Sequence, residues 1–486
     1  MHITKRDLLA GIAASLPLTA YGAGVERPPA RAGRVVPPSG FEQIFASSGL
    51  GTQSGCVLLD LQSGRVVEGH NPDLARPPAS VAKAITALYA QAKLGSGHRF
   101  NTDLVATGPI SDGTLQGDLY LVGGGDPQLD ADGLNRLAIA ARAAGLRRLT
   151  GRFYVVGNAL PLIERIDRDQ PVQAGYNPAI AGINLNYNRV YFEWKRQSGQ
   201  YRVTMEARAA RVRPAVRCAS MSISERATPI YSYERSGGVE RWSVARAALG
   251  NGGGRWLPVR DPATYAADVF QTLAGMQGIT LPLGAQAERL VRGSVVARLQ
   301  SDPLNTILTG MLRYSTNLTA EVLGLSATRA EGGGVASLRA SAQAMGRWVA
   351  QQARGSTPNF FNHSGLTDQS RISAQEMALF LAKPSSQNGL AGILRDVGLQ
   401  NPRGDGVEIP GVKVLAKSGT LNFTRGLAGY IVKNNQPRYA FAIFTADMAA
   451  RRTAAPSEER PAGAGRWRGI ARAQEKALVY RWASRL

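Results

Sequence analysis

Apolar residues recur along this chain with two periods, one typical of helices and one typical of strands. Helical spacing predicts helices over residues 40–48, from residue 80 onward, over 303–353, over 373–383 and over 467–486. Alternating or β-branched runs predict strands over residues 56–61, 66–69, 412–417, 426–433 and 438–446. A hairpin early in the chain, with three strands and a helix at its end, is what a five-stranded antiparallel sheet built from both ends requires.

Residues 100–297 carry a different pattern, in which short strands are separated by glycine and proline. We interpret this region as a β-rich insertion of two subdomains that meet near residues 160–175. One would comprise about 100–170 with 275–297, and the other about 171–274. Residues 40–99 and 298–486 would form the domain that holds the five-stranded sheet flanked by helices. A chain of 486 residues exceeds what one core comfortably supports, and the predicted class is α/β, of the α+β kind.

The first 24 residues resemble an export signal. Lys5-Arg6-Asp7 precedes an apolar run from Leu8 to Ala20, and small residues follow near the expected cleavage site. Residues 25–39 are rich in proline, arginine and glycine and predict a flexible leader. We therefore expect a periplasmic protein exported by the Sec or the twin-arginine route. A cytosolic protein with a buried N-terminal helix is the alternative.

The chain is strongly basic, with a formal net charge of +22. Residues 201–260 include eleven arginines but only four acidic residues. These arginines alternate with small and apolar residues and carry no nucleic-acid-binding motif, so nucleic acid is not an expected partner. An anionic wall polymer or membrane surface is the favoured partner for the excess charge, and a plain solvated surface is equally compatible with it.

Cysteine and histidine are too scarce and scattered to indicate a disulfide framework, a metal site or a cofactor. Cys56 and Cys218 are the two cysteines, and the four histidines lie far apart in the sequence. Cys56 falls in a predicted strand and is expected to be a small buried hydrophobe, although an oxidising compartment would also permit a bridge to Cys218. A Ser/His/Asp triad or a zinc peptidase is poorly supported.

Ser80 and Lys83 form an S-x-x-K motif directly after Pro77-Pro78, where an apolar helical pattern begins. A spacing of three places both side chains on one helix face, within reach of each other. A lysine whose ammonium form is destabilised by burial or by neighbouring cations can act as the base for a serine nucleophile. The alternative is an ordinary helix start with a capping serine and a solvated lysine.

A second motif, Ser315-Thr316-Asn317, lies between two helical stretches and predicts a turn. Such a turn can offer the Ser315 hydroxyl for proton relay to a leaving group and the Asn317 amide for binding a substrate backbone. Taken alone, the same residues are equally suited to capping the following helix.

A third motif, Lys417-Ser418-Gly419-Thr420, begins at the end of the strand predicted over 412–417. A strand edge here can bind an extended peptide while Lys417 attracts a carboxylate, and Gly419 would let a ligand approach the backbone closely. Exposed lysines on an ordinary strand are the alternative. S-x-x-K, S-x-N and K-[ST]-G in this order are together the signature of penicillin-interacting acyl enzymes, which favours the catalytic interpretation of all three.

The chain resembles the D-alanyl-D-alanine carboxypeptidase/endopeptidase family of low-molecular-mass class C penicillin-binding proteins, serine peptidase family S13. The separation of about 230 residues between Ser80 and Ser315 is typical of this family and argues against a simple β-lactamase. Beyond the three motifs, the resemblance rests on Gly117-Asp118-Leu119-Tyr120, Gly124-Gly125-Asp126-Pro127, the segment 181–188 with Asn184 and Asn186, and Ser364-Gly365-Leu366.

The resemblance implies a transpeptidase-like domain and an acyl-enzyme mechanism. Ser80 would attack the bond between two terminal D-alanines, Lys83 would accept its proton, and Ser315 with Lys417 would pass a proton to the leaving D-alanine. Asn317, Ser418, Gly419 and Thr420 would bind the substrate, and the backbone N–H groups of Ser80 and Thr420 would stabilise the oxyanion. Peptidoglycan stem peptides, their cross-links and β-lactams are the implied ligands.

The sequence departs from the family pattern at three places. Gly157-Asn158 replaces an acidic residue found in many relatives, Asn362-His363 replaces the usual Asp-Gly before Ser364, and Ser418 replaces the commoner threonine. A β-lactamase-like or small-ester hydrolase, and a non-catalytic peptidoglycan-binding homologue, are the alternative function classes. Retention of Ser80, Lys83, Ser315, Asn317 and Lys417 counts against the non-catalytic alternative.

Overall fold

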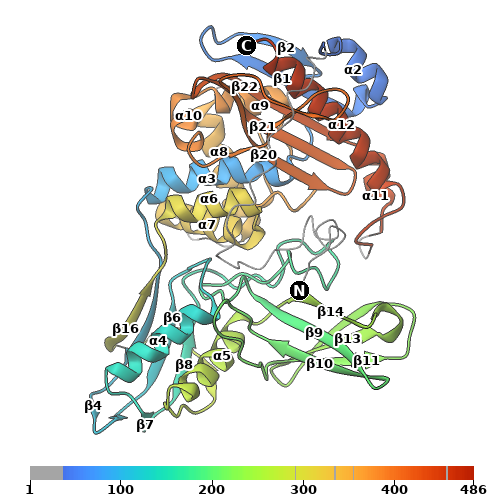
Figure 1. Ribbon diagram of the computed structural model, residues 1–486. Helices are drawn as coiled ribbons and strands as arrows, with labels where there is room; N and C mark the ends of the chain where they lie inside the picture. Colours follow the sequence, from blue (N-terminus) through green and yellow to red (C-terminus); the bar gives the residue numbers. More distant parts are fainter. Residues whose placement is uncertain (1–36, 291, 333–334, 336, 354, 456–457) are drawn as a thin grey trace. The chain divides into compact units, whose positions relative to one another are not determined.

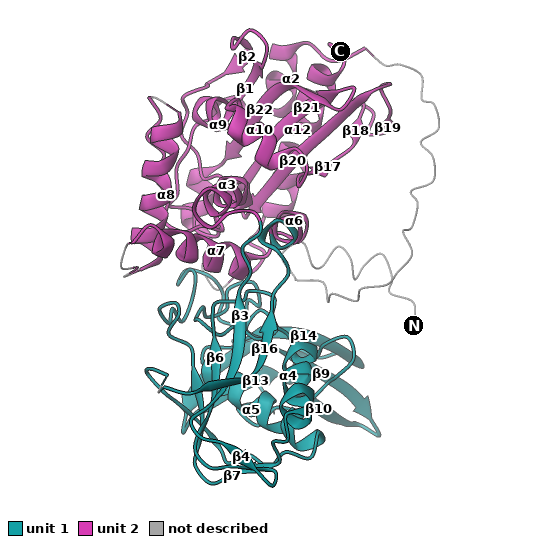
Figure 2. Cartoon of the chain, turned by 90° about the vertical axis from the view of Figure 1, so that its left-hand side faces the viewer, with its two compact units in different colours: residues 1–21, 97–307 teal, residues 22–96, 308–486 magenta. Residues whose placement is uncertain are grey.

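The computed structural model describes residues 37–486 except 291, 333–334, 336, 354 and 456–457. The predicted export signal and all but the last residues of the predicted leader lie outside this range. The described residues form two compact units, one of residues 97–307 and the other of 37–96 with 308–486 (Figure 2). The predicted insertion, residues 100–297, lies within the first unit, and the three motifs all lie within the second.

The second unit is built around an antiparallel sheet with the strand order β17-β20-β21-β22-β1-β2. This sheet has six strands rather than the five predicted. The added strand is β17, which pairs with β20 at Leu415 and Ala416 and is too short, at two residues, to leave a pattern in the sequence. The strands are β1 (Ser54–Asp60), β2 (Val66–His70), β17 (Arg395–Asp396), β20 (Val412–Leu421), β21 (Thr424–Lys433) and β22 (Gln436–Ala446).

Helices cover both faces of this sheet (Figure 1). On one face, α2 (Phe41–Ser48) and α12 (Ala464–Ala483) share a hydrophobic core with Val414 and Ala416 of β20. On the other face, α9 (Ala374–Leu381) lies against β1 and β22, and its Leu381 carbonyl accepts a hydrogen bond from Tyr430 at 3.0 Å. Since side chains alternate between the faces of a strand, Lys417 and Gly419 lie on the face away from α12.

Six further described helices lie in this unit or at its boundary, and several of them adjoin the first two motifs. The first motif leads into α3 (Ala82–Leu94), and the second separates α6 (Leu304–Tyr314) from α7 (Asn317–Ala330), which α8 (Leu338–Gln352) follows. Two short helices were not predicted: α10 (Pro384–Leu390) and α11 (Met448–Thr453). Each has a local start signal, Pro384 in the first turn of α10 and Asp447, whose side chain accepts from Ala450 N, before α11.

The first unit has four sheets, consistent with a β-rich region. Its five-stranded sheet has the order β15-β8-β6-β3-β16, and two three-stranded sheets have the orders β10-β9-β14 and β11-β13-β12. These strands are β3 (Asn101–Ala106), β6 (Leu119–Gly123), β8 (Phe153–Val156), β9 (Arg189–Gln197), β10 (Gln200–Glu206), β11 (Ala219–Ser224), β12 (Tyr231–Ser236), β13 (Val239–Ala245), β14 (Gly252–Pro258), β15 (Gly284–Gln286) and β16 (Ser294–Gln300). A small sheet joins β4 (Ile110–Ser111), β5 (Thr114–Leu115) and β7 (Arg148–Leu149).

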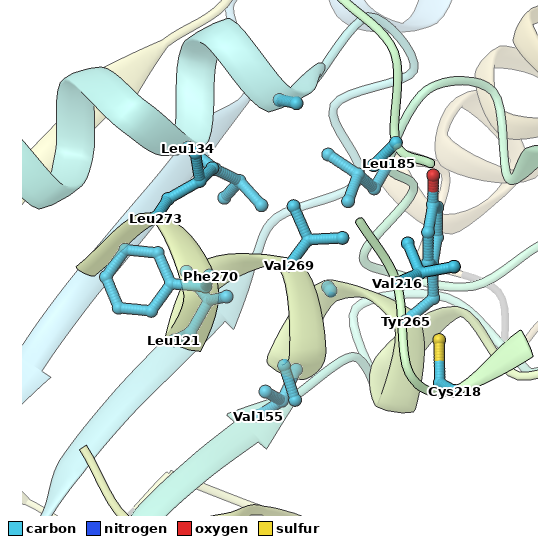
Figure 3. Close-up of a cluster of buried hydrophobic side chains, with 14 of the residues drawn as sticks. Leu121, Leu134, Val155, Leu185, Val216, Cys218, Tyr265, Val269, Phe270 and Leu273 are labelled. Carbon is cyan, nitrogen blue, oxygen red and sulfur yellow. The ribbon is translucent and has the colours of Figure 1, made fainter. Parts of the chain in front are cut away.

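Two helices of the first unit were not predicted, α4 (Ala131–Ala143) and α5 (Pro262–Met276). Both have N-terminal signals, since the Asp130 side chain accepts from Gly133 N and that of Asp261 from Thr264 N. The two helices pack together in one hydrophobic core with β6 and β8, and this core continues to Cys218 (Figure 3). The core therefore includes residues from both predicted subdomains of the insertion.

Cys56 and Cys218 are both buried and both have free thiols, so the bridge considered as an alternative is not formed. Burial raises the pKa of Cys56 to about 12, which leaves its thiol protonated and unreactive. Among the described residues, none of the helices combines the length and the apolar composition that crossing a membrane requires.

Candidate active site

The predicted nucleophile, Ser80, lies in a short 3-10 turn, η2 (Ala79–Val81), which leads directly into α3. The α-helix therefore begins two residues later than predicted. Ala79 has a φ of 47°, in the left-handed region that residues with a side chain rarely adopt. Backbone strain of this kind often accompanies functional residues because the surrounding structure must hold it in place.

Two glycines from other motifs hold this turn. A Cβ atom on Gly419 would lie 2.7 Å from both Pro78 O and Ser80 N, and one on Gly365 would lie 1.8 Å from Ala79 O. We predicted that Gly419 would let a ligand approach the backbone. The turn that carries Ser80 occupies the space that a side chain at this position would need, so the missing side chain lets this turn pack against β20. The approach of a ligand at Gly419 stays a prediction.

Lys83 lies one turn after Ser80, is fully buried and has three hydrogen-bond partners. Its Nζ contacts Ser80 Oγ at 2.9 Å, Asn317 Oδ1 at 2.8 Å and the Ser364 carbonyl oxygen at 2.7 Å. The last two oxygens only accept, so in the neutral amine they take the two N–H groups. The remaining lone pair then points at the Ser80 hydroxyl, which is the geometry that a general base needs.

The surroundings also favour the neutral form of Lys83. Burial, and then the positive charge of Lys417, hold the pKa of Lys83 well below its usual range, although the carboxylate of Glu321 opposes them. Burial, followed by Arg395 and Arg425, lowers the pKa of Lys417 to about 7. Lys417 can therefore exchange a proton near neutral pH, and the surroundings of Lys83 favour the neutral amine that a general base requires.

The second motif forms the predicted turn between α6 and α7. Ser315, at a φ of 59°, is the first of the two residues between these helices and is half-buried, and Asn317 is the first residue of α7. The Asn317 amide contacts Lys83, so the structure brings this motif to the first. The predicted proton-relay role of Ser315 and substrate-binding role of Asn317 stay predictions.

Lys417 is an interior residue of β20, which continues to Leu421 rather than ending at 417 as predicted. It is buried, and its Nζ donates to the Ser418 carbonyl oxygen at 2.6 Å. Within the described residues, β17 covers the outer edge of β20 only at Leu415 and Ala416. Beyond that point, the strand that carries Ser418, Gly419 and Thr420 has an edge that no described strand pairs.

The backbone groups at this edge can be assigned from the hydrogen-bond pattern. Val414 O accepts from Val397 N at 2.9 Å, so the backbone groups of Val414 face the β17 side. Because these groups alternate along a strand, those of Ser418 and Thr420 face the same side. The Thr420 N–H group is thus available to a ligand at this edge, while the Thr420 hydroxyl accepts from Arg425 at 2.8 Å.

Sequence reasoning missed two groups of the site, the Ser364 carbonyl and Glu321. The Ser364 carbonyl is part of the loop 362–366, and Glu321 accepts hydrogen bonds from the same loop. The sequence indicated the Ser364-Gly365-Leu366 tripeptide only as part of the family resemblance. The departures in this loop are accommodated, since Asn362 Oδ1 accepts from Gly365 N at 2.9 Å and His363 is fully buried. Burial lowers the pKa of His363 to about 3, so this residue adds no charge.

His363 fills space that a glycine on α7 leaves free, and this contact gives a testable prediction. A Cβ atom on Gly324 would lie 2.1 Å from the His363 ring. We expect Gly324→Ala to lower the free energy of unfolding by about 3 kcal/mol through overpacking. The double variant Gly324→Ala/His363→Ala should be more stable than the sum of the single effects predicts, as urea unfolding of all four proteins would measure. Additive effects would show that the two residues do not compete for this space.

A buried lysine aimed at a serine hydroxyl, an S-x-N turn against that lysine, and a second lysine on an open strand edge define an active-site serine hydrolase of the penicillin-interacting class. The chain belongs to the D-Ala-D-Ala carboxypeptidase 3 (S13) family, which it matches over residues 41–466. This membership confirms the resemblance seen in the sequence.

Individual relatives agree with the family assignment. The chain is 22% identical to the D-alanyl-D-alanine carboxypeptidase DacB of Haemophilus influenzae over 432 residues, which cover 84% of this chain and 89% of that protein. A 105-residue stretch, 21% of this chain and 19% of its relative, is 38% identical to the D-alanyl-D-alanine carboxypeptidase of Actinomadura sp. strain R39. The crystal structure of penicillin binding protein 4 from Haemophilus influenzae superposes with a TM-score of 0.69 at 20% identity, covering 91% of this chain and 98% of that one.

Proposed function

We propose that this protein is a serine D-alanyl-D-alanine carboxypeptidase that also cleaves D-alanyl cross-links of peptidoglycan and is acylated by β-lactams. The observation that carries the proposal is the contact between Lys83 Nζ and Ser80 Oγ at 2.9 Å, beside two oxygens that can only accept from the same amine. In its neutral form the amine therefore keeps its lone pair for the Ser80 hydroxyl. The Haemophilus influenzae relative has also been crystallised with a β-lactam, which supports the same ligand class here.

In the proposed reaction, Ser80 Oγ attacks the carbonyl carbon of the penultimate D-alanine and Lys83 takes its proton. The oxyanion is stabilised by the N–H groups of Ser80 and Thr420, and the peptide is held at the open edge of β20. A proton passes through Ser315 and Lys417 to the departing amine. Water then attacks the acyl-enzyme ester and releases the shortened peptide and the Ser80 hydroxyl. A β-lactam forms the same ester, which hydrolyses slowly.

The proposal includes a periplasmic location, supported by the signal-like first 24 residues, where peptidoglycan is accessible. The net charge of +22 supports attraction to anionic wall polymers. Contact with a membrane surface stays a prediction from the same charge.

Release of D-alanine from a synthetic stem pentapeptide ending in D-Ala-D-Ala tests this function. We expect release by the wild type, none from a peptide ending in D-Ala-L-Ala, and a loss of at least about 1,000-fold in Ser80→Ala. Ser63→Ala, which alters an exposed serine of the β1–β2 turn, should keep full activity. Rapid turnover of penicillin without peptide hydrolysis would favour a β-lactamase. Binding of peptidoglycan without either reaction would favour a non-catalytic homologue.

A further inference from the structure

Glu321 is a fully buried carboxyl group on α7, one helical turn after Asn317. Residues four apart lie on the same face of a helix, so Glu321 and Asn317 face the loop 362–366 and Lys83 together. A buried carboxyl group is rare unless the protein satisfies its oxygens, because removal from water disfavours the charged form.

The loop supplies donors to both oxygens of Glu321. Oε2 accepts from His363 N at 2.9 Å, and Oε1 accepts from Ser364 N at 2.8 Å. The Ser364 side chain also favours the ionised form of this carboxyl group and so lowers its pKa. The next group along this backbone is the Ser364 carbonyl, which accepts from Lys83 at 2.7 Å. The carboxylate thus holds the peptide unit whose carbonyl orients the amine.

We propose that Glu321 is a positioning residue for acylation: it fixes the Ser364 carbonyl that orients Lys83 toward Ser80, and it balances the positive charge of Lys417 at the buried amine. The inference rests on the proposed function, since it assigns a role within the acylation step. Glu321 itself contacts neither Ser80 nor the expected substrate edge, and it acts through Ser364 and Lys83.

Charged groups reach Lys83 from two neighbouring elements. Burial is the largest cause that lowers the pKa of Lys83, and the positive charge of Lys417 on β20 lowers it further. The carboxylate of Glu321 on α7 raises it. After burial, the positive charges of Arg395 and Arg425 lower the pKa of Lys417. The buried His363 is neutral and adds no charge. Burial raises the pKa of Glu321, whereas the Ser364 side chain, the backbone N–H donors of His363 and Ser364, and Lys83 favour the ionised form. Loss of this anion should therefore lower the pKa of Lys83 further.

The test is the rate of labelling by a fluorescent penicillin, measured against pH for wild type and Glu321→Gln. Glutamine keeps the shape but turns one acceptor into an NH2 group that faces an N–H donor, so the loop must shift. We expect the highest labelling rate to fall about tenfold or more, because small displacements of a catalytic group are costly. The rate requires neutral Lys83 and rises with pH, so the midpoint should move to lower pH. The ratio of variant to wild-type rate should accordingly increase as pH falls.

Two further variants separate positioning from general stability. Glu321→Asp keeps the charge but withdraws the carboxylate by one methylene, so its labelling rate should fall about tenfold while its midpoint stays at the wild-type value. Ser341→Ala removes the hydroxyl that contacts His363 Nε2 at 2.8 Å, without changing any charge, and should lower the unfolding temperature but leave the midpoint unchanged.

The outcomes are distinguishable. Rates are counted per folded molecule, from the stoichiometry of label at completion. A wild type that takes no label would refute the proposed function itself. A labelled wild type, with an unchanged midpoint in Glu321→Gln or a wild-type rate in Glu321→Asp, would refute the role of Glu321 alone.

Discussion

Lys83→Ala should slow acylation by a β-lactam about 1,000-fold or more, since general-base catalysis by a positioned group contributes about 100- to 10,000-fold. The amine that contacts Ser80 Oγ at 2.9 Å is the only described group seen to hydrogen-bond that hydroxyl. Removal of the side chain also leaves Asn317 Oδ1 and the Ser364 carbonyl without their donor. The loss is measured as the second-order rate constant of labelling by a fluorescent penicillin.

A conservative variant distinguishes a base from a fixed charge at this position. Arginine keeps the positive charge and the donors but does not deprotonate in proteins, so Lys83→Arg should be as inactive as Lys83→Ala. Lys413→Ala, an exposed lysine of the same β20 strand, is the matched control and should label at the wild-type rate. Labelling of Lys83→Arg near the wild-type rate would contradict the assignment of Lys83 as the base.

Gly365→Ala should both destabilise the protein, by about 4 kcal/mol, and abolish labelling. Gly365 has a φ of +73°, which strains any other residue, and a Cβ atom there would lie 1.8 Å from Ala79 O. The substitution must therefore displace the η2 turn that carries Ser80. Urea unfolding gives the change in stability, and labelling gives the change at the nucleophile.

A second glycine isolates the cost of the backbone conformation. Gly404 has a φ of +87°, but no atom lies within 4 Å of the position that a Cβ would take. Gly404→Ala should therefore cost only about 1 kcal/mol and leave labelling unchanged. Equal destabilisation by the two substitutions would show that the close contact with Ala79 does not support the turn.

Much of the second unit could be predicted because its elements are long and locally patterned. The alternating strands over 426–433 and 438–446 and the helical run after Ser80 follow from period alone. Strand β17 could not be predicted, because two residues are too few to show an alternating pattern. Its residues form a strand only through their pairing with β20. The helices α4 and α5 carried cap signals, but the surrounding glycine and proline favoured an interpretation as strands and turns.

The side chains of the site were predictable from three motifs, whereas its supporting groups were not. The Ser364 carbonyl is a backbone atom, and every residue has one, so no pattern marks it as the partner of Lys83. Glu321 looks like any helical glutamate in the sequence, and only the fold reveals that it is buried against residues 363 and 364. The need for glycine at 365 and 419 likewise follows from their closeness to Ala79 and Pro78, which lie far away in the sequence.

The most direct test of the central claim is the mass of the intact protein after incubation with benzylpenicillin, followed by peptide mapping. We predict one covalent adduct per chain, located on the peptide that contains Ser80 and absent from Ser80→Ala. An adduct at another residue, or neither adduct nor penicillin turnover in a folded wild type, would contradict the claim that Ser80 is an acyl-enzyme nucleophile activated by Lys83.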